Sequence, residues 1–144
     1  MTNAYTGVFP VHKNQFKVGA TAESLNTVAD LETFGVAFDN GIEEWHPFES
    51  EGWVRRLMTA KSVTITFSGK RNIGDTGNDW VAGLALKNGA EATGVLEWTM
   101  VSGAKLILNG VFNVTNDGGG DSTNVGGLEF EVQSDGKPTF TPAA

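Results

Sequence analysis

The chain has 144 residues, with 17 acidic residues, 10 basic residues and a formal charge of −7. This length corresponds to one domain that can bury a hydrophobic core, and the lack of cysteine excludes disulfides and thiolate metal sites. The acidic balance argues against a protein that grips nucleic acid, because that affinity comes mainly from Lys and Arg on phosphates. No membrane-spanning apolar run or signal-peptide layout is seen, so we expect a protein kept in the cytoplasm.

We treat residues 1–144 as a single domain in which residues 1–28 form a possible N-terminal arm. Residues 16–20 fit a short strand. Leu25, Val28 and Ala29 have helical spacing, but their segment is short and rich in Thr and Asn. The pattern leaves one helical turn and an extended arm equally open.

The segment 32–48 predicts a β-hairpin. Phe34, Val36 and Phe38 alternate with smaller or polar residues, which indicates a strand with one buried face. Asn40-Gly41 follows, and this pair favours a type I′ turn. A turn there puts Trp45 on the face of the three apolar residues. It puts Ala37, Asp39, Ile42, Glu44 and His46 on the opposite face.

Residues 49–61 fit either a helical turn or a strand, whereas residues 62–70 alternate clearly and predict a strand. GKRNIGDTGNDWVAG, residues 69–83, then reads as a loop that enters a helix of about ten residues. Asp75, Thr76 and Asn78 are good N-cap residues, and Asn88-Gly89 fits the end of such a helix. The stretch resembles a phosphate-binding loop only poorly, because no Lys or Arg enters the helix start.

Three more strands are predicted over residues 94–101, 105–116 and 128–134. A tight turn at 102–104 joins the first two, and Gly110 marks a bulge or bend. The sequence therefore predicts a mainly β protein: an antiparallel β-sandwich or flattened barrel of about seven strands with one flanking α-helix.

The residues favour no catalytic chemistry, metal site or cofactor. His12 and His46 lie far apart in sequence, and no serine has the context of a nucleophile elbow. The carboxylate pairs Glu43/Glu44 and Glu129/Glu131 fit a solvated sheet face better than acid–base work. DGGGD, residues 117–121, offers two carboxylates, too few for a calcium site, and we interpret it as a mobile loop.

Three blocks of sequence together resemble a tail tube (major tail) protein of tailed bacteriophages and phage-tail-like particles. They are DLETFGVAFDNGIEEWHPF, GWVRRLMTAKSVTITFSGKRNIGDTGNDWVAG and GLEFEVQSDGKPTFTP, within residues 28–142. The resemblance implies a β-sandwich with a flanking helix, assembled as hexameric rings that stack into a hollow tube. It also implies that DNA passes through the lumen without specific binding, and that the protein is not an enzyme. The implied location is the virion tail, with assembly in the host cytoplasm.

The implied partners are other copies of the chain and the tape-measure, tail terminator and distal tail proteins, with no membrane. An acidic strand face fits such a lumen, because it repels phosphate. The candidate lumen-facing residues are Glu97, Glu129 and Glu131 on one strand face or Asp39 and Glu44 on another, and the sequence leaves open which face lines the lumen. The candidate contacts between subunits are Lys70, Arg71, Asn40 and Gly41. The alternative is a monomeric β-sandwich virion module that binds a carbohydrate or receptor through Trp45, Trp53 and Trp98.

Overall fold

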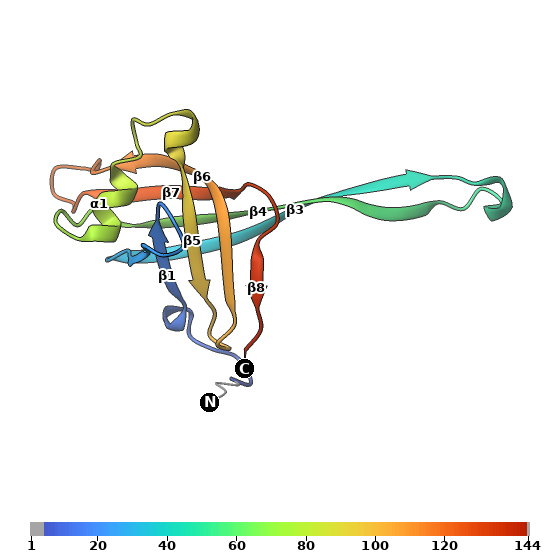
Figure 1. Ribbon diagram of the computed structural model, residues 1–144, viewed down its shortest axis with the longest axis horizontal. Coiled ribbons are helices and arrows are strands. Elements are labelled where there is room, and N and C mark those ends of the chain that lie inside the picture. Colours follow the sequence, from blue (N-terminus) through green and yellow to red (C-terminus); the bar gives the residue numbers. More distant parts are fainter. Residues whose placement is uncertain (1–4, 144) are drawn as a thin grey trace.

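A computed structural model describes residues 5–143 and shows a mainly β domain from which one hairpin projects (Figure 1). The elements are β1 (Gln15–Gly19), β2 (Asn26–Thr27), β3 (Leu31–Trp45), β4 (Arg55–Lys70), α1 (Thr76–Ala82), β5 (Thr93–Thr99), β6 (Lys105–Asp117), β7 (Gly127–Ser134) and β8 (Thr139–Thr141). Short 3₁₀ turns occupy Val11–Lys13, Phe48–Ser50 and Gly89–Ala92. The predicted fold class, antiparallel β with a single flanking helix, is confirmed.

All eight strands belong to one antiparallel sheet with the order β2-β1-β5-β6-β7-β4-β3, and β8 pairs with β6 beyond the end of β7. The sheet curls until its two ends face each other. The ring of Phe16 in β1 lies 4.7 Å from that of Phe34 in β3 and 4.8 Å from that of Phe67 in β4. Because no ladder joins β1 to β3 among the described residues, the result is a flattened barrel with an open seam.

The core fills the inside of this curled sheet and continues beneath α1. Leu96, Leu108, Leu128, Ile65 and Val132 are almost fully buried and alternate with polar residues that face outward. Such alternation is what a sheet with one packed face requires.

Helix α1 begins where Asp75 caps it, as predicted: the Asp75 Oδ2 atom accepts a hydrogen bond of 2.9 Å from the backbone N–H of Asn78. The predicted length and C-terminal stop were wrong, because the helix ends at Gly83 and Asn88 instead caps the next 3₁₀ turn. Gly77 lets the helix lie directly on β2, where an added Cβ atom would overlap the backbone of Thr27.

The predicted hairpin turn at Asn40-Gly41 was wrong. Both residues lie inside β3, paired with Lys61 and Ala60 of β4, and the chain reverses between residues 46 and 54. The alternating pattern runs on past Gly41, so a long ladder outweighs the local turn preference. Glu51 and Gly52, with φ values of 51° and 89°, supply the positive dihedral angles at the real turn.

Other local expectations met mixed outcomes. The segment around Leu25 is extended, and residues 49–61 supply the turn and the start of β4. Gly110 is paired within the ladders and not bulged. A glycine fits this position because an added Cβ atom would crowd the carbonyl of Gln133. The bulge of β6 lies between Val114 and Asn116, and β8 was not foreseen.

Truncation of one core leucine tests the packing. We expect Leu96→Ala to lower the free energy of unfolding by about 2–5 kcal/mol, because it leaves a cavity in the closed core. Leu86→Ala removes the same atoms from a side chain that is 98% exposed, and it should change stability by less than about 0.5 kcal/mol. Urea unfolding followed by circular dichroism measures both, and equal effects would contradict the described core.

Candidate functional site

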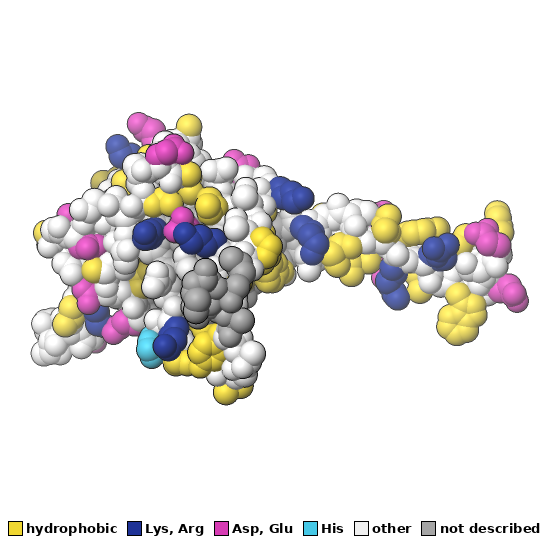
Figure 2. Space-filling view, turned by 60° about the horizontal axis from the view of Figure 1, so that its bottom comes forward, with side chains coloured by type: hydrophobic (Ala, Val, Ile, Leu, Met, Phe, Trp, Pro, Cys, Tyr) yellow, Lys and Arg dark blue, Asp and Glu magenta, His cyan; other side chains and the backbone are white. Residues whose placement is uncertain are grey.

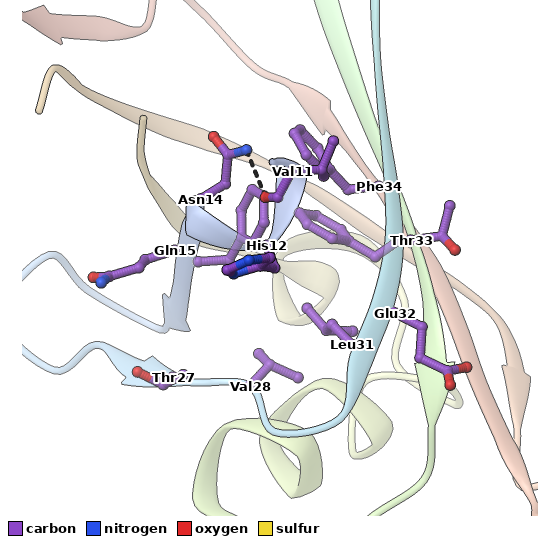
Figure 3. Close-up of a pocket in the computed structure, with 12 residues that line it drawn as sticks. Val11, His12, Asn14, Gln15, Thr27, Val28, Leu31, Glu32, Thr33 and Phe34 are labelled. Atoms are coloured by element: carbon purple, nitrogen blue, oxygen red, sulfur yellow. Dashed lines mark hydrogen bonds between the residues drawn. The ribbon is translucent and has the colours of Figure 1, made fainter. Parts of the chain in front are cut away.

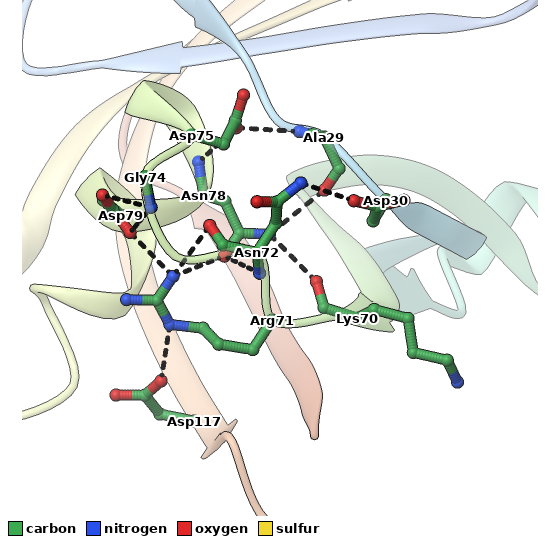
Figure 4. A network of polar contacts seen from close by, with 10 residues as sticks. All are labelled: Ala29, Asp30, Lys70, Arg71, Asn72, Gly74, Asp75, Asn78, Asp79 and Asp117. Atoms are coloured by element: carbon green, nitrogen blue, oxygen red, sulfur yellow. Dashed lines mark hydrogen bonds and ion pairs between the residues drawn. The ribbon is translucent and has the colours of Figure 1, made fainter. Parts of the chain in front are cut away.

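A network of polar contacts joins the loop after β4 to α1 and to the β2–β3 connection (Figure 4). Its centre is Asn78, the buried polar residue of α1. The Asn78 Nδ2 group donates to the carbonyls of Ala29, at 3.1 Å, and Lys70, at 3.0 Å. The Asn78 Oδ1 atom accepts from Arg71 Nη1, at 2.9 Å, and from the backbone N–H of Asn72, at 3.0 Å. The buried amide therefore has all of its hydrogen bonds satisfied.

Arg71 is the second member of this network. Its Nη1 group lies 2.8 Å from Asp79 Oδ1, and its Nε group lies 3.0 Å from Asp117 Oδ1. The side chain is only 18% exposed. Hydrogen bonds to Asp79, opposed by burial and helped by Asp117, raise the pKa of Arg71. GKRNIGDTGNDWVAG is thus a structural joint between β4 and α1, and the guanidinium of Arg71 is engaged within its own chain.

The other candidate contacts between subunits lie elsewhere. Lys70 is half-exposed and pairs with Glu32 of β3 at 3.1 Å. Asn40 and Gly41 lie near the base of the projecting hairpin, where Asn40 Oδ1 accepts a weak hydrogen bond of 3.4 Å from Lys61 Nζ. The structure does not bring these residues together with Arg71.

Four of the five predicted acidic residues share the outer face of the sheet. Glu131 pairs with Thr66 of β4 and Asn113 of β6, and Thr66 pairs in turn with Gly35 of β3. Strand alternation then places Glu129 and Asp39 on that same face, and Glu97 joins it through Ile107 of β6.

The surroundings of these carboxylates differ. From the body to the base of the hairpin, the outward-facing positions of β3, β4 and β7 in the described chain hold Thr, Ser, Gln, Gly, Ala and carboxylates, with Lys70 at the end of β4 as the one basic residue. They are Thr33, Gly35, Ala37, Asp39, Ser62, Thr64, Thr66, Ser68, Lys70, Gly127, Glu129, Glu131 and Gln133. Glu97 instead lies opposite Lys17 of β1. Asp39, Glu129 and Glu131 form no ion pair within the described chain, whereas Lys70 at the end of β4 pairs with Glu32. The part of the outer face formed by β3, β4 and β7 is therefore acidic on balance.

Glu44 does not belong to this face. The irregularity in the hairpin arises from an extra residue in β4, Thr59, so β3 itself stays regular. Five positions separate Asp39 from Glu44, which puts their side chains on opposite faces. Glu44 instead pairs with Arg56 of the neighbouring strand at 2.9 Å. The same-face prediction for Asp39 and Glu44 was wrong, because it rested on the misplaced turn.

The projecting part of β3 and β4, residues 38–61, carries exposed apolar side chains along its whole length (Figure 2). They are Phe38, Ile42, Trp45, Phe48, Trp53, Leu57 and Met58. These side chains lie on both faces of the two-stranded ribbon, and a monomeric soluble protein rarely leaves so many large apolar side chains exposed on one arm. Sequence reasoning missed this feature, although the Glu-Gly pair at 51–52 between two apolar runs was a signal for the turn.

The three tryptophans suggested for a binding platform are not neighbours. Trp98 packs inside the barrel against Phe16 and Phe34, and its Nε1 group donates to Asn14 Oδ1 at 2.9 Å. Trp45 and Trp53 are exposed on the hairpin, with the Arg55 guanidinium 5.8 Å from the Trp45 ring centroid.

A pocket of about 560 Å³ opens at the seam between β1 and β3 (Figure 3). It contains His12, but the carboxylate of Glu32 points away from that imidazole. His46 lies in the hairpin turn, far from His12. Within residues 5–143, no three His, Asp or Glu side chains are grouped to hold a metal ion, and no helix could span a membrane.

Comparison with solved structures shows where this fold occurs. A chain from the tail of an empty gene transfer agent particle with C6 symmetry superposes with a TM-score of 0.72 and 19% identity. The match covers 93% of this chain and 99% of that one. A chain from the virion of the native gene transfer agent particle has a TM-score of 0.71, with the same identity and coverage. No protein-family model matches the sequence, and no curated protein matches it. The fold expected from the resemblance is therefore confirmed.

The polar network should make the fold sensitive to acid. The hydrogen bond from Arg71 lowers the pKa of Asp79, with desolvation opposing and the N–H of Gly74 assisting. A carboxyl with a lowered folded pKa stabilises the fold above its unfolded pKa of about 3.9, and this contribution is lost as the pH falls towards the folded value. Asp79→Asn should therefore lower the urea midpoint at pH 7 and differ less from wild type below about pH 4.

The matched control is Glu23→Gln, which removes an exposed carboxylate that forms no ion pair within the described chain. Its urea midpoint should follow wild type across the pH range. A constant difference between Asp79→Asn and wild type from pH 7 to pH 3 would contradict the assigned role of the Arg71–Asp79 pair.

Proposed function

We propose that this chain is a structural tail tube subunit that polymerises as stacked hexameric rings into a hollow tube through which DNA passes. The observation that carries the proposal is the fold shared along almost the whole chain with a tail chain of a C6-symmetric particle. A sixfold arrangement of this chain follows from that likeness as part of the proposal. The role is architectural and not enzymatic.

The projecting hairpin supports self-assembly. Its seven large apolar side chains are exposed in the described chain, so an isolated subunit would leave them in water. Burial of apolar surface against a neighbour is the main driving force for association. Asn40 and Gly41 lie within this hairpin and remain proposed contacts between subunits. Lys70 lies at the opposite end of β4, where it is half-exposed, and is kept as a further proposed contact.

The free edge of β3 gives a second reason. In the described chain this 15-residue strand is the end of the sheet and pairs only with β4. Long edge strands offer unpaired N–H and C=O groups to another chain, and proteins usually shield them. Pairing with a neighbouring subunit would satisfy these groups and continue the sheet around a ring.

The outer face of β3, β4 and β7 is the proposed lumen surface. Asp39, Glu129 and Glu131 make it acidic, and hydroxyl side chains keep it hydrated. Its one basic residue in the described chain, Lys70, already pairs with Glu32, so little positive charge is left to hold phosphate. Glu97 lies on the same face nearer to β1 and is kept in the proposal, whereas Glu44 lies on the opposite face of the hairpin.

Tape-measure, tail terminator and distal tail proteins complete the proposed set of partners, and the proposed location is the virion tail after assembly in the host cytoplasm. The alternative, a monomeric binding module, would have to use the two exposed hairpin tryptophans. Such a module should stay monomeric and gain thermal stability from its ligand.

Self-assembly is the first prediction of the tube proposal. Purified protein should form rings or hollow rods as its concentration rises, visible by negative-stain electron microscopy and by light scattering. The apolar hairpin drives this association, so high salt should not abolish it. A strictly monomeric protein at every concentration, stabilised by a sugar or receptor fragment, would contradict the proposal in favour of the binding module.

Charge reversal tests the lumen face. Tubes of Glu129→Lys/Glu131→Lys should bind short duplex DNA measurably in fluorescence polarisation, with an affinity that falls as salt rises, whereas wild-type tubes should not. Glu23→Lys/Glu91→Lys makes the same charge change elsewhere on the surface and is the control. Equal DNA binding by both variants, or none by the lumen variant, would contradict this assignment.

A further inference from the structure

The base of the hairpin contains an apolar groove of about 510 Å³ that the chain itself leaves open. Phe38, Val63, Leu106 and Pro138 line it, and Phe38 is 66% exposed. Lys61 and Lys137 also line it, and no carboxylate does. Its lining residues lie mainly where β3 and β4 leave the body and in the connection from β7 to β8.

The turn at the far end of the same hairpin carries exposed aromatic side chains and negative charge, which complement the apolar lining and the positive charge of the groove. Phe48 is fully exposed and Trp53 is 79% exposed, and both belong to the turn that contains Glu49 and Glu51. The two aromatic side chains offer apolar surface, and the carboxylates beside them are negative. Figure 2 shows acidic side chains at the far end of the arm, with basic side chains close behind them, and further basic side chains where the arm leaves the body. The segment 43–56 still carries four carboxylates, Glu43, Glu44, Glu49 and Glu51, against two guanidinium groups, Arg55 and Arg56.

The turn holds its shape through local contacts. The N–H of Ser50 donates to the carbonyl of Pro47, at 3.1 Å, and the N–H of Trp53 donates to the carbonyl of Ser50, at 2.9 Å. The left-handed conformations of Glu51 and Gly52 complete the reversal. A preorganised turn loses little conformational entropy on binding, which favours its insertion into a groove of another molecule.

The tip cannot fill the groove of its own chain. The register of β3 and β4 is continuous from the groove to the turn apart from one extra residue, so the arm is a paired ribbon. From residue 38 to residue 48 it spans about 30 Å at the rise of an extended strand. Such a ribbon cannot reverse onto its own base.

We propose that the hairpin tip of one copy docks into the groove at the hairpin base of a second copy. The aromatic residues Phe48 and Trp53 cover the apolar floor, and Glu49 and Glu51 face Lys61 and Lys137. The occupant is a second copy because each chain supplies one tip and one groove of opposite charge. Tip and groove are different surfaces, so the contact is head-to-tail and can close into a ring. This inference rests on the proposed self-assembly and names the surfaces that meet.

Charge exchange across the contact tests it. Glu49→Lys/Glu51→Lys and Lys61→Glu/Lys137→Glu should each raise the protein concentration needed for assembly by about tenfold or more, because like charges then face each other. The chain that carries all four changes should assemble near the wild-type concentration. Light scattering measures these thresholds, and circular dichroism checks that each variant is folded.

Cross-linking gives an independent readout, because the wild-type chain has no cysteine. A short thiol-reactive cross-linker should join Glu49→Cys chains to Lys137→Cys chains when the two are mixed. It should join Glu49→Cys chains far less to Leu86→Cys chains, whose cysteine replaces an exposed residue away from the groove.

The two proposals fail in different ways. Wild-type protein that assembles, together with no rescue by the fourfold variant and no preference for Lys137→Cys, would overturn tip-to-groove docking while the tube proposal stands. Wild-type protein that never assembles would contradict the tube. Cross-linking reads contact between two copies and does not require closed rings, so it decides the docking in either case.

Discussion

The fully satisfied side chain of Asn78 is the interaction on which the architecture depends. A buried amide is costly unless all its donors and acceptors are paired, and here its partners are the backbone before β3, the backbone after β4 and the guanidinium of Arg71. These contacts tie both base strands of the hairpin to the helix at one point. Arg71 then extends the connection to Asp117 at the end of β6. One polar network thus fixes the end of the sheet from which the long ladder of β3 and β4 starts.

A ladder fixed at one end can leave the body at the other end without losing its register. The same two strands therefore have two environments: in the body they cover the core, and beyond residue 38 they have water on both faces. The acidic outer face belongs to the first part and the apolar arm to the second. In the proposed tube, the acidic outer face would line the lumen and the exposed apolar side chains of the hairpin would contact other subunits.

The sequence predicted the fold class and most strands because alternation along the chain is a direct consequence of one buried face, as at Phe34 and Phe67 or at Leu128 and Phe130. It also predicted the Asp75 cap, which depends only on local geometry. It could not predict the central role of Asn78, because the partners at Ala29 and Lys70 are brought to it by the tertiary fold. Strand pairing places Asp39, Glu97, Glu129 and Glu131 on one face of the sheet. Glu44 lies on the opposite face, because the hairpin register predicted from the sequence was wrong.

The turn predicted at Asn40-Gly41 explains why the sequence did not predict the projecting hairpin. Local preference and long-range pairing conflict there, and the ladder prevails although it carries Phe48 and Trp53 into water. Natural sequences break local rules mainly where function requires it, so this conflict is itself an argument about function. The large apolar side chains of the arm stay exposed in the described chain, and contact with another molecule would remove them from water.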